Sequence, residues 1–91
     1  MNLYADPSRP CPEGWTLART PNEARALLAT GAVRRVAIGI DTGPTARAFR
    51  RLVSWMDRTG HWPSECASVH GHMRSAWAIR ETIRRHYGLP R

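Results

Sequence analysis

The sequence predicts an α/β fold, a small three-layer sandwich with a mostly parallel sheet of about four strands and three helices. Two observations predict it. Short apolar runs alternate with stretches of helical periodicity in the order β-β-α-β-α-β-α, which is typical of parallel sheets. Residues 36–40 (VAIGI) are almost continuously apolar, as in a central strand covered on both faces. At 91 residues the chain has room for one domain, expected to span residues 1–91.

The first half of the chain predicts two short strands and one helix. Residues 1–4 are a short apolar run, and the three prolines within residues 7–12 exclude both a helix and a central strand there. Residues 14–18 are consistent with a second short strand. Thr20 then precedes a proline and, three residues on, a glutamate, a pattern that begins helices; we expect this helix to end at Gly31.

The second half predicts two longer helices separated by a strand. Apolar residues recur at helical spacing from residue 44 to about residue 59, and Gly60 closes that helix. Residues 66–69 are a plausible fourth strand. A final helix is expected over about residues 73–87, before a glycine and a proline.

The charge of the chain is strongly basic and unevenly distributed. All fourteen cationic residues are Arg and none is Lys, against seven acidic residues, which gives a net charge of +7. Nine of these Arg lie in residues 46–91, against three acidic residues there. Such a field favours an anionic partner, although an Arg-only composition is also typical of GC-rich bacterial or phage genomes.

The excess Arg falls on the two later helices and is accompanied by an aromatic residue. Guanidinium groups bind phosphates in a bidentate manner and stack on bases, so this surface is chemically suited to nucleic acid. The structural alternative is a solvated helix face, partly neutralised by Asp57 and Glu81. The candidate binding residues are Arg47, Arg50, Arg51, Arg58, Arg74, Trp77, Arg80, Arg84 and Arg85.

A second candidate site lies where the predicted strands end. In parallel sheets, ligands bind beyond the carboxyl ends of the strands. Asp6, Asp41 and His70 follow or end three of the predicted strands and are expected to meet at one edge. Two carboxylates and an imidazole there would hold a divalent metal or act as acid and base on a phosphoester; capping and turn roles are the structural alternative.

The order of these motifs resembles the family of cyclic-phosphate-processing receiver domains. This resemblance implies a receiver-like, flavodoxin-type fold and an acidic pocket at the strand ends. In the family the first strand ends in a paired Asp, and a later strand ends in Asp-His-Asp-Leu-Gly. The matching segments are residues 3–6 (LYAD), 9–15 (RPCPEGW), 19–24 (RTPNEA), 36–43 (VAIGIDTG) and 69–71 (VHG).

The chain departs from the family pattern at its acidic pocket. Ala5 replaces the first acid of the pair, and Gly39 and Ile40 stand where an Asp and a His are expected. A pocket with two carboxylates in place of four is a poorer metal site and has no obvious nucleophile. The resemblance therefore implies a protein that is more a pseudoenzyme than an enzyme, and we expect no bound cofactor unless a metal-dependent activity remains.

Two functions from different classes follow. The first is a non-enzymatic binding protein whose Arg-rich helices engage nucleic acid, a nucleoprotein complex or an acidic protein, including phage inhibitors of the anti-CRISPR kind. The second is a metal-dependent phosphoesterase or cyclic-phosphate-processing enzyme that uses the reduced Asp6, Asp41 and His70 pocket. A phosphoryl switch ranks last, since no Lys exists to contact a phosphoryl group.

Location and assembly are predicted from simpler features. No apolar run approaches the length of a membrane span, and Asp6 interrupts the N-terminus, so a cytoplasmic protein without a membrane partner is expected. Cys11 and Cys66 are predicted to be free thiols. An apolar patch formed by Trp55, Trp62 or Leu89 would make a homodimer.

Overall fold

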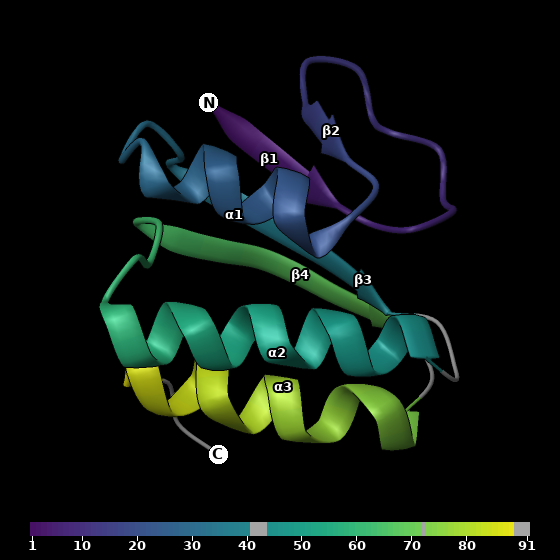
Figure 1. Ribbon diagram of the computed structural model, residues 1–91, viewed down its shortest axis with the longest axis vertical. Coiled ribbons are helices and arrows are strands. Elements are labelled where there is room, and N and C mark those ends of the chain that lie inside the picture. Colours follow the sequence, from purple (N-terminus) through teal and green to yellow (C-terminus); the bar gives the residue numbers. More distant parts are fainter. Residues whose placement is uncertain (41–43, 72, 89–91) are drawn as a thin grey trace.

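A computed structural model shows a four-stranded parallel sheet with three helices packed against it (Figure 1). It describes residues 1–40, 44–71 and 73–88, without the side chains of residues 40, 44–46, 67–71, 73–76 and 78. The elements are β1 (Asn2–Ala5), β2 (Thr16–Ala18), α1 (Pro21–Ala29), β3 (Arg35–Ile40), α2 (Pro44–Thr59), β4 (Glu65–Gly71) and α3 (Met73–Tyr87). The predicted α/β class and element order are confirmed.

The strand order is β2-β1-β3-β4, and it determines where the helices lie. The steps from β2 to β3 and from β3 to β4 run in the same direction across the sheet, so right-handed crossovers place α1 and α2 on the same face. Helix α3 packs beside α2 and against β4. The sequence favoured helices on both faces of the sheet. A helix on the second face would have to connect β1 to β2, and the proline-rich loop 6–15 makes that connection instead.

All three helices share one apolar core with alternate positions of the strands. Leu3 and Val36 are paired in register and point into this core. Their neighbours in the chain, Tyr4 and Ala37, point to the other face, where Tyr4 packs edge-on against Trp15. The core consists of Leu3, Ala5, Ala18, Ala24, Leu28, Val33, Val36, Ile38, Phe49, Leu52, Val53, Met56, Ile79 and Ile83.

Helix α1 begins at the residue that the sequence indicated. The Thr20 hydroxyl accepts a hydrogen bond from the Glu23 amide at 3.2 Å, and Pro21 occupies the first turn. This satisfies one of the amides that the first turn of a helix leaves unpaired. Gly31, at a φ of 76°, follows the end of the helix in the left-handed conformation that glycine adopts without strain.

The end of α3 is held by an aromatic cluster. Trp62 stacks on His86 with ring centroids 4.0 Å apart, and Tyr87 meets Trp62 edge-on. The Tyr87 hydroxyl donates a hydrogen bond to the Pro63 carbonyl at 2.8 Å. Burial, followed by the nearby charges of Cys66 and Glu65, raises the pKa of Tyr87 to about 12. Trp62 is therefore partly buried and packed against the core.

Three smaller predictions concern the rest of the described chain. Cys11 and Cys66 are free thiols, as predicted. Within residues 1–40, 44–71 and 73–88, no helix is long and apolar enough to cross a membrane. Trp55 is partly buried and stacked on His61, and Trp62 is also partly buried, while Leu89 lies outside the described residues. Both tryptophans make contacts within the chain, and the homodimer stays a prediction.

Candidate functional site

The carboxyl ends of β1, β3 and β4 meet at one edge of the parallel sheet, which we call the acidic edge after Asp6. Asp6 directly follows β1, and Gly39 of β3 lies in register with His70 of β4. The backbone therefore brings Asp6 and His70 to the same edge. Asp41, and the side chain of His70, lie outside the described part of the structure.

The Asp6 carboxylate is completely buried and held by its own loop. Its Oδ1 accepts hydrogen bonds from the backbone amides of Ser8, at 2.9 Å, and Arg9, at 2.8 Å. Its Oδ2 accepts a hydrogen bond from Nη1 of the Arg9 guanidinium at 3.1 Å, and the two charged groups form an ion pair. Both oxygens of this carboxylate are thus occupied by donors of the chain, and its charge is compensated by a guanidinium.

Gly39 makes room for this arrangement. A Cβ atom at position 39 would lie 1.7 Å from Asp6 Oδ2 and 2.3 Å from its Cγ. Such distances are impossible for nonbonded atoms, so any side chain here would displace the carboxylate. Gly39 is therefore a structural partner of Asp6. The Asp6–Arg9 pair fills the space that a side chain at position 39 would occupy.

Arg19 fastens the loop to the following strand. Its guanidinium donates to the Arg9 carbonyl at 2.7 Å and to the Asp6 carbonyl at 3.4 Å. The Asp6 amide donates to the Ala18 carbonyl at 3.1 Å, which extends the pairing of β1 with β2 by one bond. Two arginines thus close the loop over the buried carboxylate.

The surroundings of Asp6 keep its carboxyl ionised. Burial alone would raise its pKa. The hydrogen bonds from the Arg9 and Ser8 amides and the adjoining Arg9 guanidinium outweigh this effect, so that the pKa of Asp6 is lowered. A group with this environment is a structural anion and not a proton donor poised near neutral pH.

The described part of the acidic edge does not fit a divalent metal. A cation there would have to displace the Arg9 guanidinium from Asp6 Oδ2 and two amides from Oδ1. In the same described part, no group of three or more His, Cys, Asp or Glu side chains could hold a metal ion. Sequence reasoning identified Asp6 but missed Arg9 and Arg19, whose only signal was one cation within the proline-rich loop and one directly after β2.

Helix α2 carries three exposed arginines of the basic surface on one side. Phe49, Leu52, Val53 and Met56 bury one side of this helix in the core. Arg47, Arg51 and Arg58 lie on the opposite side at the helical period of 3.6 residues, and all three are exposed. Within the described residues these three guanidinium groups have no acidic partner. We call these three residues the α2 stripe.

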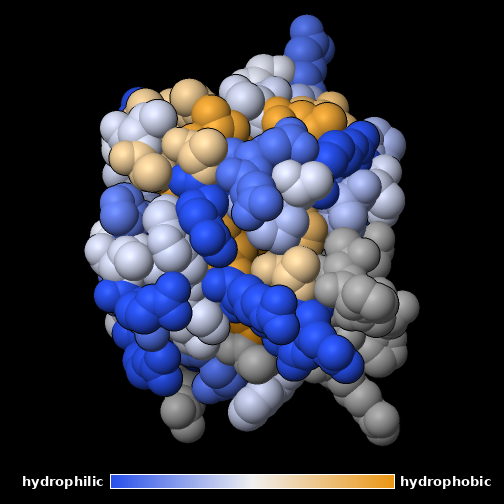
Figure 2. All heavy atoms as spheres, viewed as in Figure 1, coloured by the Kyte–Doolittle hydropathy of each residue, from blue (hydrophilic) through white to orange (hydrophobic). Residues whose placement is uncertain are grey.

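Arg50 and helix α3 contribute a more compensated surface. Exposed Arg50 lines a small cavity of about 120 Å³ between α2 and α3. Two arginines of α3 form ion pairs. Arg84 Nη1 lies 3.6 Å from Glu81 Oε1, and Arg85 Nη2 lies 3.3 Å from Oδ2 of Asp57 in α2. Strongly hydrophilic side chains cover much of the face where α2 and α3 lie (Figure 2). The predicted counter-charges therefore act on α3 more than on the α2 stripe.

The remaining predicted binding residues differ in exposure. Trp77 of α3 is 64% exposed, as predicted. Arg80 is partly exposed, and the side chain of Arg74 lies outside the described residues. Trp77 therefore offers an aromatic ring to solvent on a helix that packs beside α2.

The four-stranded parallel sheet and its three helices define a small receiver-like domain, in which the Asp6 carboxylate at the strand ends is paired with Arg9. The chain belongs to the cyclic-phosphate processing receiver domain family, whose model matches residues 1–86. The resemblance seen in the sequence is thereby confirmed. A comparison with curated proteins found no match, and neither did a comparison with solved structures.

Proposed function

We propose that this receiver-domain protein is a non-enzymatic binding protein that engages single-stranded nucleic acid through the α2 stripe. The observation that carries the proposal is the row of three exposed arginines, Arg47, Arg51 and Arg58, without an acidic partner in the described chain. Unpaired cations aligned on one rigid element repel each other, and an anionic strand relieves that repulsion.

The spacing of the α2 stripe suits a phosphate backbone. At 1.5 Å per residue, Arg47 and Arg51 are separated by about 6 Å along the helix, and Arg51 and Arg58 by about 10 Å. The guanidinium fork binds two phosphate oxygens at once, which an ammonium does not do. A strand laid along α2 would therefore bring phosphates within reach of all three arginines, although not at equal intervals.

The exposed ring of Trp77 favours a single strand over a duplex. Unpaired bases stack on aromatic side chains, and each stacked base contributes roughly 1–3 kcal/mol. A duplex keeps its bases stacked inside and would use only the arginines. A nucleoprotein that displays a single strand would be bound by the same contacts, which is how an inhibitor of the anti-CRISPR type would act.

The enzymatic alternative is weaker because of the state of Asp6. A carboxylate that accepts three hydrogen bonds from its own loop, one of them from a guanidinium, is not free to bind a metal or to take a proton from substrate. Asp41 and His70 remain candidates for that alternative. Metal-dependent hydrolysis of a cyclic phosphate that is lost in Asp41→Ala would favour it over the binding function.

The proposal is tested by binding of a labelled oligonucleotide. We expect the variant with Arg47, Arg51 and Arg58 all changed to Ala to bind a single strand of about 15 nucleotides roughly 100-fold more weakly, because three charge-assisted contacts are lost. Fluorescence anisotropy at fixed ionic strength measures this affinity. Circular dichroism checks that α2 remains folded.

A matched control separates the α2 stripe from net charge. Arg25→Ala removes one charge from an exposed position on α1, and Arg51→Ala removes one charge from the α2 stripe. Arg25→Ala should bind within about twofold of the native chain, with the remaining loss due to long-range charge, whereas Arg51→Ala should bind about fivefold more weakly. Equal losses in these two single variants, or tighter binding of an acidic peptide than of the oligonucleotide, would contradict the proposal.

A further inference from the structure

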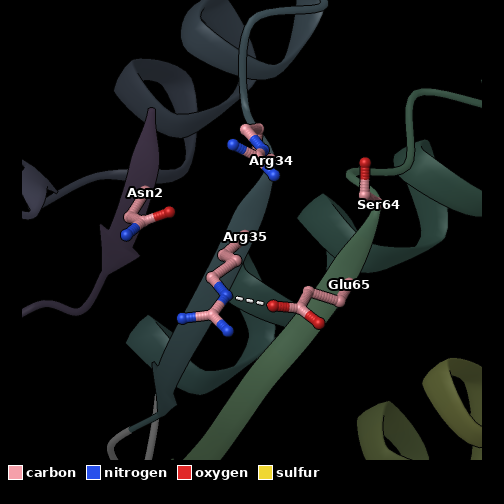
Figure 3. Close-up of a pocket in the computed structure, with 5 residues that line it drawn as sticks. All are labelled: Asn2, Arg34, Arg35, Ser64 and Glu65. Atoms are coloured by element: carbon pink, nitrogen blue, oxygen red, sulfur yellow. Dashed lines mark hydrogen bonds and ion pairs between the residues drawn. The ribbon is translucent and has the colours of Figure 1, made fainter.

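A polar pocket lies at the amino ends of the strands, at the opposite end of the sheet from Asp6. Its volume is about 460 Å³, within the range of roughly 300–1,000 Å³ that small-molecule sites occupy. It is lined by Asn2, Arg34, Arg35, Ser64 and Glu65 (Figure 3). Neither the acidic edge nor the α2 stripe includes any of these residues.

The register of the sheet aligns three of these side chains. Asn2 of β1 pairs with Arg35 of β3, which pairs in turn with Glu65 of β4. The next row, which contains Leu3 and Val36, points into the core beneath the helices. Because side chains alternate along a strand, the row of Asn2, Arg35 and Glu65 points to the other face of the sheet. The pocket thus opens away from the helix layer.

The pocket presents an unused guanidinium fork. Arg35 donates through Nε to Glu65 Oε1, and this is its one side-chain bond to a described residue. The contact orients the guanidinium while its two terminal nitrogens keep their donors for another group (Figure 3). The two side chains are 53% and 52% exposed, so a ligand reaches them without a rearrangement.

Arg34 makes the pocket electropositive. Its backbone amide donates to the Met1 carbonyl, and its carbonyl accepts from the Glu65 amide, so its main chain is fixed at the start of β3. Its exposed side chain has no partner among the described residues. Two guanidinium groups against one carboxylate leave a net positive charge, and the Ser64 hydroxyl and Asn2 amide add neutral donors.

We propose that this pocket binds a small molecule through a phosphate monoester group. A phosphate has three terminal oxygens and close to two negative charges at neutral pH, so it matches both guanidinium groups and a hydroxyl donor at once. A carboxylate has two oxygens and one charge and would satisfy only one fork. The remaining volume accommodates the organic part of the ligand beside Asn2, whose amide donates and accepts hydrogen bonds.

This site is separate from the proposed nucleic-acid surface. It lies on the face of the sheet that α1 and α2 leave uncovered. Along β1, Asn2 of the pocket and Asp6 are four residues apart, or about 13 Å. The inference does not depend on the α2 stripe. If the nucleic-acid proposal fails, the pocket proposal is still tested by variants of the pocket residues, and the reverse also holds.

The test is a nuclear magnetic resonance titration of the native chain with adenosine 5′-monophosphate and with inorganic phosphate at constant ionic strength. We expect amide shifts at the starts of β1, β3 and β4 for both probes. Arg34→Ala and Arg35→Ala should each weaken binding of the nucleotide about tenfold. Arg25→Ala removes the same charge from an exposed position on α1, outside both proposed sites, and should change the affinity for the nucleotide less than twofold. Thermal melts check that each variant is folded.

Several results would overturn the inference. These are equal weakening by Arg25→Ala and Arg35→Ala, adenosine bound as tightly as its monophosphate, acetate bound as tightly as inorganic phosphate, or shifts confined to α2. Tenfold weakening by both pocket variants, together with adenosine failing to bind, would establish the site as one for a phosphate monoester.

Discussion

Replacing Gly39 by Ala should lower the free energy of unfolding by roughly 2–3 kcal/mol, although the change adds a single methyl group. The added carbon would lie 1.7 Å from Asp6 Oδ2. Relief requires the carboxylate to move, and movement breaks its bonds to the Ser8 and Arg9 amides. The loss would be measured by urea unfolding.

A double-mutant cycle separates this clash from the ordinary effects of alanine in a strand. In an Asp6→Ala background the atoms that obstruct position 39 are absent, so the added methyl group should cost less than about 1 kcal/mol. A cost that is the same in both backgrounds would show that Gly39 and Asp6 do not depend on each other, contrary to the structure.

Asp6→Asn should cost about 2 kcal/mol at neutral pH, because bonds to a charged acceptor are replaced by bonds to a neutral amide. The pKa of Asp6 is lowered by folding, so its stabilising contribution is present above the unfolded value of about 4 and is lost as pH falls through the folded pKa. The native chain and the variant should thus differ at pH 7 and converge in acid.

The control for this comparison is an exposed carboxylate. Asp57→Asn removes the ion pair with Arg85, in which both side chains are exposed, and should cost less than about 0.5 kcal/mol. Unfolding curves between acidic and neutral pH provide the measurement. If Asp6→Asn and Asp57→Asn behave alike at pH 7, the Asp6 carboxylate does not hold the loop.

Signals that act within a few residues made most of the fold predictable. Thr20 begins α1 because its own hydroxyl caps the helix, and α2 has the predicted limits because its apolar side repeats every 3.6 residues. The family resemblance then supplied the arrangement of the sheet. The placement of α1 and α2 on the same face of the sheet was harder to predict. It depends on the strand order, and local sequence patterns carry no information about strand order.

The candidate site could be predicted only in part. Asp6 was found because a carboxylate follows the first strand, and the reduced acidic pocket stays a prediction. The bond from Arg9 back to Asp6 and that from Arg19 to the Arg9 carbonyl depend on the path of a loop with no periodicity. The sequence showed Gly39 as a missing acid, whereas its closeness to Asp6 is visible only in three dimensions.

The salt dependence of single-strand binding by the native chain tests the central claim most directly. If three phosphates contact the α2 stripe, the logarithm of the binding constant should fall against the logarithm of salt concentration with a slope near −2 or steeper. Changing Arg47, Arg51 and Arg58 to Ala should reduce the size of that slope by about 2. A native slope near zero, or a slope that the triple variant leaves unchanged, would contradict a nucleic-acid function for this surface.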